Sequence, residues 1–110
     1  MSTSPRQEEV WLVALDRTKG AEIRKTRPCL VISPDEMNRH LQTVIIAPMT
    51  TVIRRFPTRI SVRFQGTSGQ VALDQLRAVD RYRLVKKIGT IPESTARQIS
   101  TTLLEMFRRV

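Results

Sequence analysis

An amphipathic helical pattern occurs once in this chain of 110 residues, near its carboxy-terminal end. Apolar residues recur there at intervals of three and four, which is the spacing of one stripe along a helix. The segment Thr90-Ile91-Pro92-Glu93 fits a capping box, so we predict a helix with Thr90 as its N-cap. Arg108 and Arg109 are expected in the last turn, where they complement the helix dipole. The predicted stripe consists of Ala96, Ile99, Leu103, Met106 and Val110.

The rest of the chain consists of short apolar runs of strand length with no long helix between them. One helical turn is expected at 35–38. Parallel strands need helical crossovers. Because no long helix lies between the apolar runs, βαβ units are excluded and a mainly β (α+β) fold remains. We predict a small antiparallel sheet or barrel with the terminal helix packed against it. Five to seven short strands are predicted: Val10–Leu15, Pro28–Ile32, Thr43–Pro48 and Thr58–Phe64, with Val71–Leu73 and Leu76–Val79 as further candidates and residues 84–89 leading to the final helix.

Individual strands differ in how they are expected to be buried. The runs that begin at Val10 and Pro28 are continuously apolar, which indicates burial on both faces. The run 58–64 alternates instead, so Ile60, Val62 and Phe64 are expected in a core and the residues between them in water or on a ligand. Segment 66–69 is predicted as a turn. We expect one domain over 1–110, with 1–8 as a flexible extension.

Charge and composition narrow the class of partner. The formal net charge is +9, and 15 of the 19 basic residues are Arg, whose planar fork suits bidentate phosphate contacts. The first residues lack the apolar segment of a secretory signal, and no run is long enough to span a membrane. Cys29 and His40 are the only residues of their kinds, so no zinc site is expected. We expect Cys29 in the core, His40 in solvent, and a cytoplasmic protein without a cofactor.

The first candidate segment is the basic connection before the second strand, centred on Gly20. It offers several cations around one carboxylate, which suits a phosphodiester, although a solvated loop has the same composition. Arg27 differs from its neighbours because Pro28 restricts it to extended geometry at a strand edge. A cation fixed there is a better electrostatic stabiliser than one on a mobile loop. The charged residues of this segment are Lys19, Glu22, Arg24, Lys25 and Arg27.

Two further segments carry polar side chains at strand ends. Thr50 follows the third strand and can bind a phosphate oxygen or a sugar hydroxyl, or it has a purely structural role. Asp74 follows a buried strand and can orient an arginine, read a base edge, or form a structural ion pair. The neighbours that we expect to share their surface are Thr51, Arg54, Arg55, Gln75 and Arg77.

In their number and order, these segments resemble toxins of the MazF/PemK family, from about Glu9 to the final helix. The resemblance is carried by Glu9-Val10-Trp11, Asp16-Arg17-Thr18-Lys19-Gly20-Ala21-Glu22, Lys25-Thr26-Arg27-Pro28, Ser33-Pro34, Asn38, Pro48-Met49-Thr50, Asp74-Gln75, Asp80, Arg83-Leu84 and Lys87-Ile88-Gly89.

The resemblance implies an SH3-like barrel that acts as a homodimer. It also implies a sequence-specific, metal-independent endoribonuclease that cuts single-stranded RNA and leaves a 2′,3′-cyclic phosphate and a 5′-hydroxyl. The acidic C-terminal segment of a cognate antitoxin is expected in the RNA groove, and DNA is expected to bind only the toxin–antitoxin complex. Arg27 and Thr50 occupy the family's catalytic positions. The expected RNA-binding residues are Lys19, Gly20, Glu22, Arg24, Lys25, Thr51, Arg54, Arg55, Asp74, Gln75 and Arg77.

Three departures from the family pattern bear on activity. The usual Asp-Pro-Thr is Asp16-Arg17-Thr18, and the usual Ser or His after Gly20 is Ala21. Ala72 stands where one branch of the family has an Arg that works with that His, so that version of the site is absent. The general base is open among Glu22, Asp74 and water. A non-catalytic basic barrel that binds nucleic acid or an acidic peptide is the alternative function.

Overall fold

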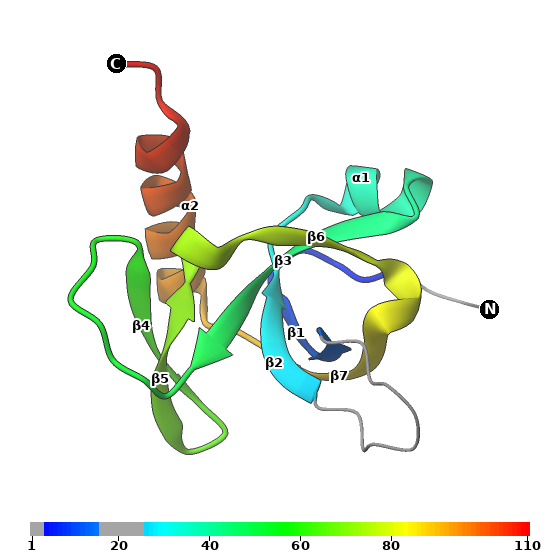
Figure 1. Ribbon diagram of the computed structural model, residues 1–110, viewed down its shortest axis with the longest axis horizontal. Coiled ribbons are helices and arrows are strands. Elements are labelled where there is room, and N and C mark those ends of the chain that lie inside the picture. The colour runs from blue at the N-terminus through cyan, green and yellow to red at the C-terminus, as the bar shows by residue number, and fades with distance from the viewer. Residues whose placement is uncertain (1–3, 16–25) are drawn as a thin grey trace.

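A computed structural model describes residues 4–15 and 26–110 of the chain (Figure 1). Within these residues lie seven strands, two α-helices and two short 3₁₀ segments. Their bounds in chain order are β1 Glu9–Ala14, β2 Thr26–Val31, α1 Asp35–His40, β3 Thr43–Thr50, β4 Arg59–Phe64, β5 Thr67–Ala72, η1 Leu73–Gln75, β6 Arg77–Asp80, η2 Arg81–Arg83, β7 Leu84–Thr90 and α2 Glu93–Phe107.

The strands form one antiparallel sheet curved into a half-barrel, which confirms the predicted fold class. Along the sheet the order is β4-β5-β3-β2-β1-β7, and β6 pairs with β3. Strand β3 joins the two parts of the sheet, because its first half pairs with β6 and its last two residues, Met49 and Thr50, pair with β5. With its eight residues, β3 is long enough for its C-terminal end to reach and pair with β5.

Two hydrophobic clusters explain why the central strands have continuous apolar runs. Val10, Leu30 and Met49 belong to the cluster beneath α2, whereas Val13 and Val31 belong to a second cluster on the other face. Successive residues of a strand point to opposite faces, so a strand covered on both faces has no alternation to show. Burial of both faces of β1 and β2 is therefore confirmed.

Helix α2 covers the first cluster and packs against β4, beside the β4–β5 hairpin in Figure 1. Ala96 and Ile99 are buried, and Leu103 and Met106 pack against the same cluster, which confirms the predicted stripe up to Met106.

The predicted ends of this helix are wrong. Thr90 is still in the β1–β7 ladder, opposite Glu9, and α2 begins at Glu93 with Pro92 at the N-cap position and no side-chain cap. At the other end Val110 is fully exposed, so no burial supports a further turn, and the helix stops at Phe107 before Arg108 and Arg109.

The predicted turn at 66–69 is too long. The turn consists of Gln65 and Gly66, both with positive φ, and β5 starts at Thr67, which pairs with Phe64. A two-residue hairpin loop of this kind requires positive φ at both positions.

Residues 4–8 make specific contacts with the sheet and α1: the Glu8 amide donates to Val31, and Arg6 pairs with Asp35 at 3.4 Å. These residues belong to the segment 1–8 that the sequence predicts to be a flexible extension, of which the structure describes residues 4–8.

Candidate active site

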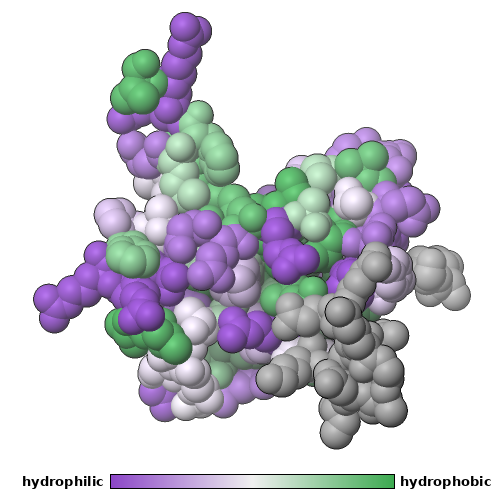
Figure 2. Space-filling view, in the orientation of Figure 1, coloured by the Kyte–Doolittle hydropathy of each residue, from purple (hydrophilic) through white to green (hydrophobic). Residues whose placement is uncertain are grey.

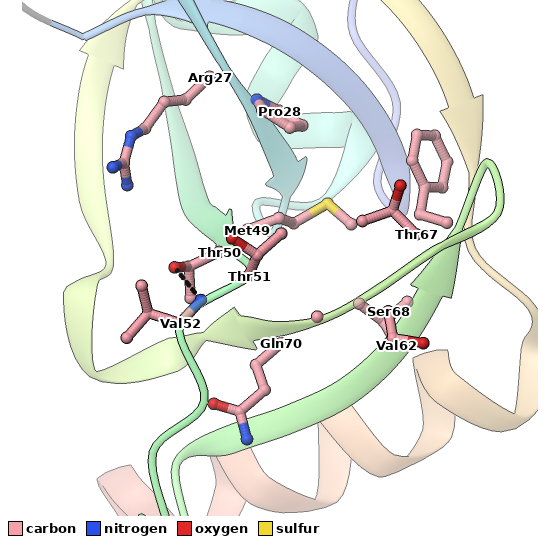
Figure 3. Close-up of a pocket in the computed structure, with 12 residues that line it drawn as sticks. Arg27, Pro28, Met49, Thr50, Thr51, Val52, Val62, Thr67, Ser68 and Gln70 are labelled. Atoms are coloured by element: carbon pink, nitrogen blue, oxygen red, sulfur yellow. Dashed lines mark hydrogen bonds between the residues drawn. The ribbon is translucent and has the colours of Figure 1, made fainter.

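An open pocket of about 310 Å³ lies where β2, β3, β4 and β5 meet (Figure 3). Its floor is mostly apolar, and polar side chains from β2, β3 and β5 stand around it. The lining residues are Arg27, Pro28, Met49, Thr50, Thr51, Val52, Val62, Phe64, Thr67, Ser68, Gly69 and Gln70.

Arg27 and Thr50, the two residues that the sequence predicts to be catalytic, both line this pocket. They lie on neighbouring antiparallel strands in which Cys29 pairs with Pro48. This pair is the last of the β2–β3 ladder. Arg27 lies two residues before Cys29, and Thr50 lies two residues after Pro48 and pairs with Gln70 of β5. Arg27 is exposed and Thr50 half-buried, so a fixed hydroxyl and an accessible guanidinium share one wall of the pocket.

The Thr50 hydroxyl is oriented by the chain that follows it. Its Oγ1 accepts a hydrogen bond from the Val52 amide at 3.0 Å, drawn as a dashed line in Figure 3. A threonine hydroxyl has one proton to donate and two lone pairs to accept. One lone pair is occupied by Val52, and among the described residues nothing else bonds this hydroxyl, so within that part of the chain the proton and the second lone pair are available to a ligand.

The connection 51–58 between β3 and β4 begins in the pocket lining with Thr51 and Val52, and we call the residues that continue from there the rim. Arg54 and Arg55 are exposed there beside exposed Val52, Ile53 and Phe56. In Figure 2 the loop lies at the left of the molecule, where hydrophilic and hydrophobic residues alternate. This rim therefore offers cationic and apolar contacts side by side.

Gln70 anchors this rim from β5 and was missed by the sequence prediction. Its Nε2 donates to the Arg54 carbonyl and its Oε1 accepts from the Arg54 amide, both at 3.0 Å. The mistaken turn at 66–69 hid the period-2 pattern of β5, and no local signal marks Gln70 as a contact of a loop 16 residues earlier. Ser68 and Gly69 were missed for the first of these reasons.

Gly69 allows β5 to approach the end of β3. A Cβ at this position would lie 2.5 Å from the Thr50 carbonyl oxygen, closer than the two atoms can come. The wall that carries Thr50 therefore requires glycine here.

Asp74 and Arg59 form an ion pair outside the pocket lining. Arg59 Nε donates to Oδ1 at 2.8 Å and Nη2 to Oδ2 at 3.2 Å, and the Thr58 hydroxyl donates to Oδ1 at 3.0 Å. The hydrogen bonds from Arg59 lower the pKa of Asp74 despite its partial desolvation. A carboxylate with a lowered pKa and both oxygens occupied is a weak base. Of the three interpretations of Asp74, the contacts match a structural ion pair.

The other predicted residues divide into three groups. Gln75 and Arg77 lie beside Asp74, on η1 and β6, and are exposed but do not line the pocket. Burial raises the pKa of the Cys29 thiol to about 12, although the positive charges of Arg27 and Arg77 act to lower it. Both guanidinium groups therefore act electrostatically on the same thiol. Thr51 lies in the pocket lining. The remaining candidates, Lys19, Gly20, Glu22, Arg24 and Lys25, lie outside the described residues, as does Ala21.

Cys29 and His40 lie where the sequence predicts them. Cys29 has no exposed surface, whereas the His40 side chain is 68% exposed and contacts Glu36. In residues 4–15 and 26–110, no three His, Cys, Asp or Glu side chains come close enough to hold a metal ion. In the same ranges no helix has the length and apolar character to cross a membrane.

Residues 6–107 match the model of a protein family described as PemK-like, MazF-like toxins of type II toxin–antitoxin systems. The chain belongs to this family. Among curated members, it is 33% identical to the endoribonuclease PemK of Escherichia coli over 97 residues, which cover 83% of this chain and 73% of that protein. It is 28% identical to the endoribonuclease MazF of Staphylococcus epidermidis over 104 residues, covering 89% of this chain and 87% of that one.

Solved structures of MazF proteins have the same fold. MazF of Deinococcus radiodurans superimposes with a TM-score of 0.79 at 22% identity and covers 98% of this chain and 100% of its own. A MazE–MazF structure from the same organism gives 0.82 at 21% identity, with 99% and 100% covered. A mycobacterial endoribonuclease in complex with its cognate antitoxin gives 0.78 at 24% identity, with 93% of each chain covered.

Proposed function

We propose that this protein is the toxin of a type II toxin–antitoxin module and a sequence-specific endoribonuclease that cuts single-stranded RNA without a metal ion. The observation that carries the proposal is the joint placement of Arg27 and Thr50 in one open pocket, with the Thr50 hydroxyl proton available. Family membership and relatives named as endoribonucleases support it.

The proposed reaction is an attack of the ribose 2′-hydroxyl on the adjacent phosphodiester. The O2′–P bond forms and the P–O5′ bond breaks, so the products are a 2′,3′-cyclic phosphate and a 5′-hydroxyl. A base removes the 2′ proton, and the departing O5′ takes up a proton. Such a transfer depends on in-line positioning and on stabilising the charge that develops on phosphorus-bound oxygens.

Arg27 and Thr50 match these needs in different ways. The Arg27 guanidinium, exposed at the pocket, neutralises the developing negative charge. Arginine stays protonated throughout the pH range in which proteins are folded, so it is a poor base and acts as an electrostatic stabiliser. Thr50 donates its free proton to a phosphate oxygen. Asp74 is a poor base because its pKa is lowered and its oxygens are bonded, which leaves Glu22 or water for that role.

The proposed partners follow from the same charge distribution and from the family. RNA binds across the pocket and the cationic rim at Arg54 and Arg55. A cognate antitoxin competes through an acidic C-terminal segment; structures of similar toxins in complex with antitoxins support the existence of such a partner. We further propose a homodimer in the cytoplasm, with one domain per chain, that contacts DNA only through the toxin–antitoxin complex.

The test compares Arg27→Ala with Arg97→Ala, which removes the same charge from the exposed face of α2. Loss of one transition-state donor costs about 10²–10³ in kcat, so Arg27→Ala should nearly abolish cleavage of a long RNA in EDTA. Arg97→Ala should cut as wild type does, and both variants should melt near the wild-type temperature. Equal cleavage by the two variants would contradict the role of Arg27.

Two further results separate the chemistry from the function. A substrate with 2′-deoxyribose at the mapped scissile nucleotide must resist cleavage, and cutting there would exclude 2′-hydroxyl attack. If wild-type protein binds RNA but never cuts it, the alternative applies, namely a non-catalytic barrel that holds nucleic acid or an acidic peptide.

A further inference from the structure

Gln70 is a buried polar side chain whose contacts lie outside the sheet. Only 6% of its surface is exposed, and its backbone pairs with Thr50 in the β3–β5 ladder. Figure 3 shows its side chain directed away from the pocket floor, toward the loop that follows β3. A buried amide without partners is costly, and this one has a partner for both of its polar atoms.

The two bonds to Arg54 imitate a strand pairing. The side-chain amide donates to the Arg54 carbonyl and accepts from the Arg54 amide, as a neighbouring strand would. Residues 53–56 have no regular secondary structure of their own, so these bonds attach an irregular segment to the rigid edge of β5.

The same segment also orients Thr50. Starting at Thr50, the backbone pairs with Gln70, the Gln70 side chain holds Arg54, and Val52 between them donates to the Thr50 hydroxyl. These contacts close a ring of hydrogen bonds through residues 50–54 and Gln70. Movement of Arg54 would therefore alter both the cationic rim and the direction of the Thr50 hydroxyl.

We propose that Gln70 is a positioning residue of the active site, which acts through the Arg54 backbone to fix the Thr50 hydroxyl and the cationic rim. This inference rests on the function proposed above. Both polar atoms of the Gln70 side chain are bonded to the Arg54 backbone, so its amide takes the place of a strand partner for the loop.

The test uses Gln70→Met, which keeps the length and apolar volume of the side chain and removes both hydrogen bonds. Gln65→Met is the matched control, because the exposed Gln65 also donates to a backbone carbonyl, that of Ile88, and does not line the pocket. Misplacement of a site by about 1 Å can cost 10²-fold in rate, so Gln70→Met should lower kcat/KM about 10–100-fold, with kcat reduced as well as KM raised. Gln65→Met should stay within about twofold of wild type.

Gln70→Glu supplies a signature that loss of stability alone would not give. The carboxylate still accepts from the Arg54 amide but faces the Arg54 carbonyl without a proton to donate. Protonation at lower pH restores a donor, so cleavage relative to wild type should recover as the pH falls, whereas Gln70→Met shows no such recovery. This variant also serves if Gln70→Met does not fold.

Amide hydrogen exchange is measured on the same proteins and does not depend on catalysis. Exchange at Arg54 and Val52 should be faster in Gln70→Met than in wild type and unchanged in Gln65→Met. Unchanged exchange at Arg54 overturns the proposal, and so does faster exchange with kcat/KM within about twofold of wild type. If wild-type protein does not cut RNA, the proposed function fails. The positioning role is then decided by RNA affinity, which Gln70→Met should weaken about tenfold and which, if unchanged, overturns it.

Discussion

Replacement of Gly69 by alanine tests how closely β5 must approach the end of β3 that carries Thr50. The added methyl would lie 2.5 Å from the Thr50 carbonyl oxygen, about 1 Å inside the usual carbon–oxygen contact of 3.3–3.6 Å. The obstacle is backbone, so relief requires β5 to separate from β3 at the position where Thr50 pairs with Gln70. Overpacking of this kind costs about 1–3 kcal/mol, and we expect the upper half of that range.

The assay combines thermal unfolding with RNA cleavage at a temperature where every variant is folded. For chains of 60–100 residues each kcal/mol lowers the Tm by roughly 4–8 °C. Gly66→Ala is the matched control, because its methyl meets nothing within 4 Å and its φ of +78° makes alanine strained. That strain costs about 1–2 kcal/mol. Gly66→Ala should lose stability but keep cleavage, whereas Gly69→Ala should lose both. Wild-type stability and cleavage in Gly69→Ala would refute the steric argument.

Three further predictions concern groups outside the pocket. Burial favours a raised pKa at Glu9, but hydrogen bonds from Arg6, Trp11 and Lys87 outweigh it and lower the pKa. The stability that the ionised Glu9 contributes is therefore present above pH 4.5 and should be lost as the pH drops further. In Glu9→Gln the free energy of unfolding should fall less steeply over the same pH range. Cys29, with its pKa near 12 and no exposed surface, should resist thiol reagents at pH 8 until urea unfolds the protein. A double-mutant cycle of Asp74→Asn and Arg59→Gln, followed by urea unfolding, should show favourable coupling, and its absence would contradict the ion pair.

The sequence predicted the elements whose signal is local. The stripe from Ala96 to Met106 repeats at helical spacing and needs no partner to be recognised, and the continuous runs at Val10 and Leu30 indicate strands covered on both faces. Element ends were predicted less well because partners decide them. Thr90 has the chemistry of an N-cap, yet pairing with Glu9 keeps it in β7.

The site shows the same division between local and non-local information. Arg27 and Thr50 were predicted because one lies directly before a recognisable strand and the other directly after one, at positions that match the family motif, and the structure brings both to one pocket. Gln70 was missed because its role depends on Arg54, a partner that only the folded hairpin brings within 3.0 Å. Asp74 had three interpretations in the sequence, and the contact with Arg59 that favours one of them crosses from β4 to η1.

The ion pairs of the described residues indicate which basic side chains contribute to the net charge of +9 without a neighbouring carboxylate. In the described part of the chain, six carboxylates pair with basic side chains, and none of these pairs includes Arg27, Arg54, Arg55 or Arg77. Within residues 4–15 and 26–110, the paired cations lie on α1, on α2 and the residue after it, on the edge strands β4 and β7 and in the segment before β1, whereas Arg27, Arg54, Arg55 and Arg77 have no ion pair among the described residues. Each of these that neutralises a phosphate should add about −0.7 to the salt dependence of single-strand binding. An acidic peptide would be drawn to the same surface, so one arrangement of ion pairs favours both the proposed substrate and the proposed competitor.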